Sequence, residues 1–285
     1  MESLSKSMKL LMTKYLYVVE TPCPICNNEM KAWREKEEGP PRCAPVCVEC
    51  GYKSLKKKEA ISTKKIFEDS LKAKAINYLK NSSLVTDKAL WNSRLYNYTE
   101  TDQETYSAKA MASEAVKKIL KDEDVHIIYS GRVGSGKSHL SMGILWKVME
   151  ESNYEKSCLF VNYRELLEQL KFAMNDDQAR KVITGTLMKE LKLASCVVLD
   201  DLGTELGSIE EARKATPYNL ETITSILEAR QNKPLIVTTN LTSKQIESVY
   251  GDRILSRMLK NSTGFSMRFM STSDKRVTPL INGDN

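Results

Sequence analysis

Residues 125–140 have the sequence VHIIYSGRVGSGKSHL, in which an apolar run leads directly into a glycine-rich turn. Residues 131–138 fit the pattern G-x-x-x-x-G-K-[ST], and the order strand, turn, helix is the context that this pattern requires. The glycines let the backbone curl so that successive N–H groups point at phosphate oxygens, and the following helix adds the partial positive charge of its N-terminus. The segment therefore predicts a phosphate-binding loop on an α/β fold.

Each side chain of the loop has an expected role. We expect Lys137 to reach the β- and γ-phosphates of ATP or ADP and the Ser138 hydroxyl to ligate Mg²⁺. His139 comes next, inside the predicted helix, where packing is a simpler role for it than ligand contact. A chance glycine-rich turn is the alternative, and the flanking strand and helix argue against it. The further residues expected to contact the nucleotide are Gly131, Gly134, Ser135, Gly136 and His139.

The chain around the loop alternates between helices and short apolar strands. Strands are predicted at 157–161, 196–200 and 234–239, and helices at 107–120, 163–193 (with a break) and 217–230. Continuous apolar strands separated by helices indicate a parallel sheet covered on both faces. We therefore expect an α/β nucleotide-binding domain over residues 107–285.

An acidic pair ends the strand at 196–200. Asp200 follows Val197, Val198 and Leu199, and Asp201 comes next. At the edge of the sheet beside the phosphate loop, Asp200 would hold Mg²⁺ and Asp201 would orient or deprotonate the attacking water. Many related ATPases have Glu at the second position, and the shorter Asp predicts slow hydrolysis. The alternative is an ordinary pair of aspartates at a strand-to-turn junction.

Two further sites follow the strand at 234–239. Asn240 ends this strand, and its amide, which can both donate and accept, suits a sensor of the γ-phosphate and the attacking water. Arg253 and Arg257 are four residues apart, so they share one face of a helix. One of them is expected to reach the γ-phosphate bound by a neighbouring subunit. The alternatives are a capping Asn and two surface arginines in salt bridges.

The N-terminal part contains five of the seven cysteines. The pairs Cys23/Cys26 and Cys47/Cys50 fit the C-x2-C…C-x2-C pattern of a zinc ribbon, in which four thiolates hold one structural Zn²⁺. Cys43 is a fifth candidate that could replace Cys47, and free or redox-active thiols are the alternative to metal. We expect a zinc-binding domain over residues 1–60, with a helix over 2–20.

Residues 61–106 are expected to form a helix and a linker. Apolar residues between 61 and 80 recur near helical spacing, and 81–106 is polar and irregular, which predicts a hinge. The basic run at 53–58 and this helix suit a docking surface, although a simple linker helix fits the pattern nearly as well.

Composition narrows the function classes. The net charge of +6 comes from the N-terminal third, which permits but does not establish contact with nucleic acid or an acidic partner. The sequence contains no apolar run long enough to span a membrane and no recognisable signal peptide, so we expect a cytoplasmic protein without a membrane partner. Metal-ligand spacing in such a protein favours zinc over disulfides.

The motifs together resemble the DnaC/DnaI family of bacterial and phage replicative-helicase loaders. The segments GRVGSGKSHL, CVVLDDLGTE, PLIVTTNL and YGDRILSRM occur in that family's order over about residues 90–270. The resemblance implies an AAA+ core with a five-stranded parallel sheet and no long helical lid. It assigns the arginine-finger role to Arg257, with Arg253 nearby. The cysteine-rich N-terminus is similar to the DnaI branch, in which a zinc-bearing domain precedes the ATPase.

The resemblance implies a loader that uses ATP to deliver a hexameric replicative DNA helicase to single-stranded DNA, with self-association of the ATPase domains. A transposition-helper ATPase has a similar core but typically lacks a zinc ribbon. A third hypothesis is an adaptor that binds nucleotide and hydrolyses almost none, which Asp201 in place of Glu leaves open.

Overall fold

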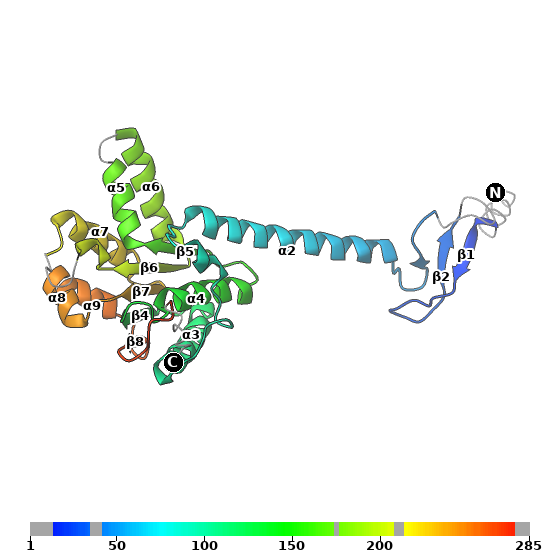
Figure 1. Cartoon of the computed structure of the whole chain (residues 1–285). Coiled ribbons are helices and arrows are strands. Elements are labelled where there is room, and N and C mark those ends of the chain that lie inside the picture. The colour runs from blue at the N-terminus through cyan, green and yellow to red at the C-terminus, as the bar shows by residue number, and fades with distance from the viewer. Residues whose placement is uncertain (1–13, 35–41, 174–176, 208–213, 277–285) are drawn as a thin grey trace, which may run out of the picture. The chain divides into compact units, whose positions relative to one another are not determined.

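The computed structural model describes residues 14–34, 42–173, 177–207 and 214–276 (Figure 1). Contacts divide the chain into two units, with the boundary between Ser70 and Leu71. Helix α2 (Ser54–Ser82) contains this boundary. The sequence placed its domain limits at 60/61 and 106/107, and those limits stay a prediction. None of the described helices combines the length and the apolar character that crossing a bilayer requires.

The N-terminal unit is a small antiparallel sheet in the order β1-β2-β3. Its strands are β1 (Leu16–Val19), β2 (Met30–Trp33) and β3 (Val46–Cys47). The helix expected over 2–20 is therefore wrong at Leu16–Val19, and residues 1–13 lie outside the described ranges. The sequence LYVV is rich in β-branched and aromatic residues, and pairing with β2 through Leu16 opposite Trp33 decides its conformation.

The larger unit contains a five-stranded sheet in the order β5-β6-β7-β4-β8, and its pairings are parallel. The predicted parallel five-stranded sheet is thus confirmed. The two strands that end in the phosphate loop and the acidic pair, β4 and β6, flank β7, which ends beside Asn240. The strands are β4 (His126–Gly131), β5 (Cys158–Asn162), β6 (Cys196–Leu202), β7 (Leu235–Thr239) and β8 (Ser266–Phe269).

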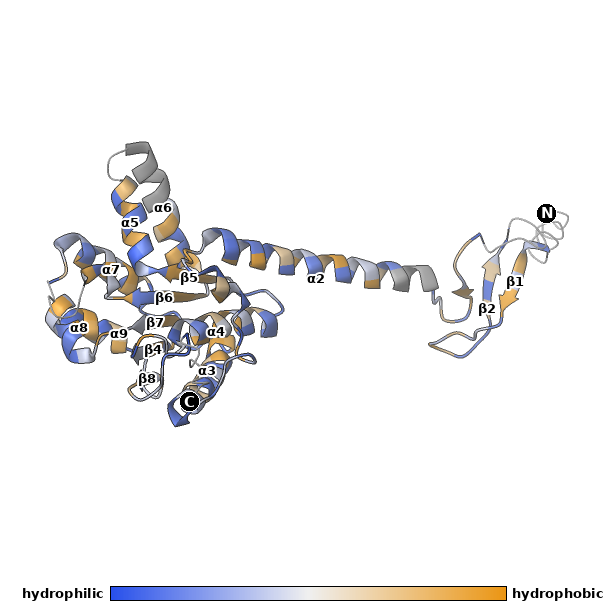
Figure 2. Ribbon diagram, in the orientation of Figure 1, coloured by the Kyte–Doolittle hydropathy of each residue, from blue (hydrophilic) through white to orange (hydrophobic). Residues whose placement is uncertain are grey.

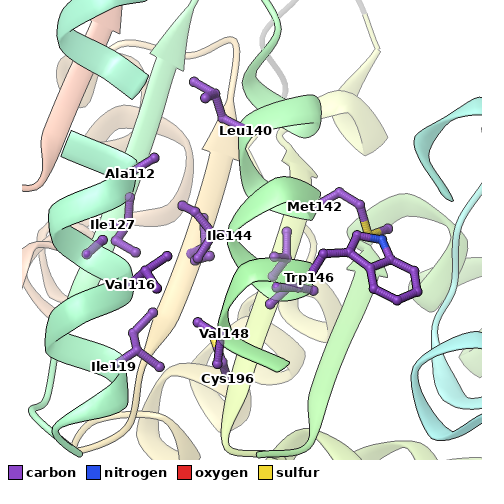
Figure 3. Close-up of a cluster of buried hydrophobic side chains, with 14 of the residues drawn as sticks. Ala112, Val116, Ile119, Ile127, Leu140, Met142, Ile144, Trp146, Val148 and Cys196 are labelled. Carbon is purple, nitrogen blue, oxygen red and sulfur yellow. The ribbon is translucent and has the colours of Figure 1, made fainter. Parts of the chain in front are cut away.

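Helices α3 (Gln103–Leu120) and α4 (Lys137–Glu151) cover one face of this sheet. Figure 3 shows Ala112 and Val116 of α3 beside Ile127 of β4 and Ile144 of α4, within one buried cluster. The spacing of four between Ala112 and Val116 places both on the buried side of α3. This packing fixes the direction of α4, whose first residue is Lys137.

The opposite face is covered by the helices that follow β5, β6 and β7. Strand residues alternate between the two faces, so Ile128 belongs to this second cluster while Ile127 belongs to the first. Figure 2 shows hydrophilic and hydrophobic residues alternating along α5 and α8, as expected for helices with one buried side. These helices are α5 (Tyr163–Ala173), α6 (Asp177–Leu193), α7 (Pro217–Ala229), α8 (Ser243–Tyr250) and α9 (Asp252–Leu259).

The segment between α2 and α3 lies against the sheet. The N–H of Leu84 donates to the carbonyl of Phe160 at 2.9 Å, and the N–H of Asn162 donates to the carbonyl of Leu84 at 2.9 Å. A short 3₁₀ helix, η1 (Lys88–Asn92), follows. The sequence predicted a hinge over 81–106, whereas in the structure the start of this segment is hydrogen-bonded to β5. Amino-acid composition does not indicate which backbone segments pair, so this contact could not be predicted from it. Residues 270–276, after β8, form no helix.

Candidate nucleotide-binding site

The phosphate loop lies between the end of β4 at Gly131 and the start of α4 at Lys137. Gly136 has a φ of +92°, and a Cβ there would lie 2.7 Å from Cε2 of Tyr98. At Gly131 (φ +109°), a Cβ would lie 2.1 Å from the carbonyl oxygen of Phe269. Glycine is required at both positions because the backbone conformation and the space each exclude a side chain.

Lys137 is 5% exposed and donates three hydrogen bonds. Its ammonium group lies 2.9 Å from the carbonyl of Gly131, 2.7 Å from the carbonyl of Arg132 and 2.9 Å from Oδ1 of Asn240. Burial lowers the pKa of Lys137 to about 8, against the opposing effect of Asp201 and Asp200. The structure therefore brings together the loop lysine and the predicted sensor.

The acidic pair lies at a β-bulge in β6, where the pairing with β7 shifts register between Leu199 and Leu202. Asp200 is 3% exposed, and Asp201 has a left-handed φ of +58°. Burial, followed by the charge of Asp201, raises the pKa of Asp200. A nearby cation would stabilise the charged form of this buried carboxyl group, as expected for a metal ligand.

Thr238 of β7 organises this acidic pair and was missed by the sequence analysis. Its hydroxyl donates to Oδ1 of Asp200 at 2.7 Å and accepts from the N–H of Asp201 at 2.9 Å. Thr238 is fully buried. The only trace of this role in the sequence is a Thr two residues before Asn240, and Thr is common in strands.

A cavity of about 570 Å³ opens over the loop. Its lining joins residues of the loop to the acidic strand end, the sensor and the segments before α3 and after β8. Asp201 and Asn240 thus line the same cavity as Lys137 and Ser138 of the loop. The lining residues from these parts include Gly134, Gly136, Lys137, Ser138, His139, Asp201, Asn240, Tyr98, Lys275 and Arg276. Gly131 and Asp200 are absent from that lining, and Ser135 is buried beneath the loop, where its hydroxyl donates to the carbonyl of Arg132 at 2.9 Å.

His139 lines this cavity and also takes part in packing. Its Nε2 lies 2.9 Å from Oδ1 of Asn97 and 3.1 Å from the carbonyl of Arg94. Its ring meets that of Tyr98 edge to face, with centroids 5.4 Å apart. His139 therefore ties the start of α4 to the segment before α3.

Arg257 lies away from this cavity within one chain. Its Nη2 lies 2.7 Å from Oε1 of Glu228, which joins α9 to α7. Arg253 is exposed on the same helix. Arg257 does not line the cavity of its own chain, so the finger role stays a prediction about an assembly.

The four cysteines of the two C-x2-C pairs come together in the N-terminal unit. Their sulfur atoms all lie within 4.8 Å of one another, with 3.5 Å between Cys23 and Cys50 and 3.5 Å between Cys26 and Cys47. Sulfur atoms around a tetrahedral Zn²⁺ with Zn–S of about 2.3 Å are roughly 3.8 Å apart. The donor set therefore fits zinc, and Cys43, which is exposed, is outside the cluster.

The two turns that present these cysteines have the same construction. The N–H of Asn27 donates to the carbonyl of Cys23, and the N–H of Gly51 donates to the carbonyl of Cys47. Asn27 has a φ of +59° and Gly51 a φ of +71°. The sequence indicated the second turn through Gly51, whereas Asn27 was not singled out.

Comparison with known proteins gives a family match over most of the larger unit. A family model described as IstB-like ATP binding protein matches residues 72–271. The replicative helicase loader DnaC of Buchnera aphidicola subsp. Baizongia pistaciae (strain Bp) is 24% identical over 191 residues, which are 65% of this chain and 70% of the relative.

Solved structures share the fold. The crystal structure of the DnaC helicase loader has a TM-score of 0.54 at 21% identity and covers 65% of this chain and 100% of its own. The crystal structure of DnaI has a TM-score of 0.52 at 20% identity and covers 66% of this chain and 96% of its own. The predicted AAA+ core, with a cysteine-bearing N-terminal unit, is confirmed.

Proposed function

The chain belongs to the IstB-like ATP binding protein family, and on that premise we propose that it hydrolyses ATP to load a hexameric replicative DNA helicase onto single-stranded DNA. The single observation that supports hydrolysis best is the convergence of Lys137, Asp201 and Asn240 on one cavity. The loader role is supported by the similarity to a replicative helicase loader, DnaC. A replicative helicase of a bacterium or a phage works on DNA inside the bacterial cell, so we assign the protein to the cytoplasm as part of this proposal.

Side chains around the cavity have complementary tasks in this proposal. Lys137 moves its ammonium group from the loop carbonyls to the phosphates of ATP, and the N–H groups around Gly134 and Gly136 face the same phosphates. The Ser138 hydroxyl and the Asp200 carboxylate would hold Mg²⁺, which neutralises charge on the phosphates when bound. Thr238 keeps the Asp200 carboxylate oriented toward that position.

Asp201 and Asn240 act on water in this proposal. Asp201 accepts a proton from the attacking water or orients it, and burial raises the pKa of Asp201, which makes its carboxylate a better proton acceptor. Asn240 donates through its amide to the γ-phosphate or this water. The short Asp side chain is consistent with slow hydrolysis that a partner or single-stranded DNA accelerates.

Arg257 completes the site of a neighbouring subunit in this proposal. In one chain the guanidinium of Arg257 is paired with the Glu228 carboxylate, with 2.7 Å between Nη2 and Oε1. To reach a γ-phosphate, Arg257 must therefore exchange this carboxylate for the phosphate. A phosphate oxygen next to Mg²⁺ is a stronger partner than a half-exposed carboxylate. Self-association of the ATPase units is therefore part of the mechanism.

The N-terminal unit is a zinc-stabilised docking module in this proposal. Cys23, Cys26, Cys47 and Cys50 would hold one structural Zn²⁺, since four thiolates leave no open position for chemistry. Such a small sheet buries little apolar surface, so a metal would supply much of its folding energy. The helicase is the partner that we assign to this module.

A co-purification experiment tests the loader role. The full chain with ATP is mixed with a hexameric replicative helicase in one sample and with a transposase in another, and each mixture is separated by size. Retention of the helicase alone, with ATP turnover that rises on adding single-stranded DNA, supports the proposal. Retention of the transposase alone would favour a transposition helper. Helicase retention without turnover would favour the non-hydrolysing adaptor.

A further inference from the structure

The carboxylate of Glu104, in the first turn of α3, accepts hydrogen bonds from the chain just after β8. The N–H groups of Met270 and Ser271 lie 3.1 Å from its oxygens, and that of Thr272 lies 3.0 Å away. The hydroxyl of Thr272 adds a fourth donor at 2.8 Å. Three successive N–H groups around one anion form a concave anion-binding arrangement. Glu104 and Thr272 are 168 positions apart, and their contact fixes the segment just after β8 to the start of α3.

The segment held in this way crosses the phosphate loop. The N–H of Lys275 donates to the carbonyl of Gly134 at 3.0 Å. A Cβ on Gly134 would lie 1.8 Å from Oδ1 of Asp274, so the segment lies directly on the loop backbone. The same Oδ1 accepts from the N–H of Arg276 at 2.9 Å, which turns the chain back toward the cavity.

Two cationic side chains of this segment enter the nucleotide cavity. The Lys275 ammonium lies 3.8 Å from the ring centroid of Tyr98, a cation–π contact, and also donates to the carbonyl of Thr99. Arg276 lines the cavity together with Lys137 and Asp201. Burial is the main cause of the pKa shifts of these two residues, downward for Lys137 and upward for Asp201, and the charge of Arg276 adds a smaller lowering effect on each. The segment thus supplies positive charge next to the expected phosphates.

The geometry points to Glu104 as a positioning residue that latches Met270–Thr272 and thereby holds Lys275 and Arg276 at the bound nucleotide. This inference rests on the proposed function and extends it to a residue that touches neither nucleotide nor metal. Burial would raise the pKa of Glu104, but the hydrogen bonds from Thr272 and the N–H groups outweigh it and lower the pKa to about 2. The carboxylate is therefore ionised throughout the neutral range, as a permanent latch requires.

Conservative variants test the latch. Glu104→Gln removes the charge, and Glu104→Asp keeps the charge in the first helical turn but shortens the reach. Thr272→Val removes the hydroxyl donor from the other side. We expect each variant to bind ATP about tenfold more weakly by calorimetry, which is within the usual range of coupling between sites. Glu114→Gln is the matched control, because Glu114 lies on the same helix and its ion pair among the described residues is with exposed Lys117.

A double-mutant cycle separates positioning from general stability. If Glu104 acts through Lys275 and Arg276, then Glu104→Gln has no further effect on ATP affinity in a Lys275→Ala/Arg276→Ala background. An equal loss in both backgrounds would show that Glu104 acts by another route and would overturn the inference. Unchanged affinity in folded Glu104→Gln and Glu104→Asp proteins would overturn it as well.

Limited trypsin digestion without nucleotide gives a readout that does not depend on the proposed function. Cleavage after Lys275 and Arg276 is expected to be faster in Glu104→Gln than in the wild type and unchanged in Glu114→Gln. A wild-type protein that binds no ATP would contradict the proposed function, but the digestion result would still test the latch. Equal cleavage of wild type and Glu104→Gln would contradict the latch itself.

Discussion

The ammonium group of Lys137 donates a 2.9 Å hydrogen bond to the side-chain oxygen of Asn240, although the two residues lie 103 positions apart in the chain. The phosphate loop after β4 and the end of β7 are therefore parts of one site. Strand order explains the contact, because β4 and β7 are parallel neighbours whose carboxyl ends meet at the same edge.

Replacing Thr238 by Val keeps the shape of the side chain and removes its hydroxyl. The buried carboxylate of Asp200 and the N–H of Asp201 both lose a partner, so we expect a loss of about 1–3 kcal/mol in unfolding free energy and a clear drop in ATP turnover. Chemical denaturation and a turnover assay measure the two effects. Thr224→Val is the control, because within the part of the chain that the structure describes this hydroxyl donates to the carbonyl of Leu220 in its own helix. Equal effects from the two variants would refute the special role of Thr238.

Two Gly→Ala substitutions should have opposite effects on the stability of the fold. Gly136→Ala forces a Cβ to 2.7 Å from Tyr98 at a φ of +92°, so we expect destabilisation of at least about 1 kcal/mol and loss of ATP binding. Gly185 lies in α6 with open space around it, so Gly185→Ala should stabilise the fold by about 0.5–1 kcal/mol. Thermal unfolding measures the stability of both variants, and calorimetry measures ATP binding by Gly136→Ala. Unimpaired ATP binding by Gly136→Ala would contradict the loop geometry.

Zinc content tests whether Cys47 or Cys43 is the zinc ligand, a choice that the sequence left open. The cluster contains Cys47 and excludes Cys43, so Cys43→Ser should retain one zinc per chain and Cys47→Ser should lose it. Loss of the metal should unfold the N-terminal unit, because structural zinc supplies on the order of 10 kcal/mol of folding energy. Elemental analysis and circular dichroism test this. Zinc retained by Cys47→Ser but not by Cys43→Ser would show that the ligand set is wrong.

The finger role of Arg257 predicts complementation between two inactive proteins. Arg257→Ala subunits keep Asp201, and Asp201→Asn subunits keep Arg257, so a mixed assembly contains some intact sites. We expect the mixture to recover about a quarter of wild-type turnover, because one ordered pairing in four combines both intact groups. Each variant alone should be nearly inactive. A mixture no more active than its components, with both proteins folded and associated, would argue against a finger supplied in trans.

The sequence predicted the elements whose evidence is local. The loop around Lys137, the apolar strand before Asp200 and the cysteine spacing each indicate their structure within a few residues. The helix expected across Leu16–Val19 was wrong because a short apolar run does not distinguish strand from helix, and a partner strand decides.

Contacts between distant segments could not be predicted in this way. Glu104 and Thr272 are a polar pair with no motif, and Tyr98 and Lys275 meet only because β8 returns the chain to the phosphate loop. Parallel pairing of β8 with β4 puts these residues together, and neither spacing nor composition encodes that pairing locally.

ATP affinity of Lys137→Ala, measured by calorimetry with Mg²⁺, is the most direct test of the claim that this cavity binds a nucleoside triphosphate. The comparison is Lys147→Ala, which removes a lysine of the same helix whose ion pair, over the described ranges, is with exposed Glu151. We predict that Lys137→Ala weakens binding by about a hundredfold or more, since a buried ammonium–phosphate contact is lost, while Lys147→Ala binds as the wild type does. Undiminished ATP binding by a folded Lys137→Ala protein would contradict the account.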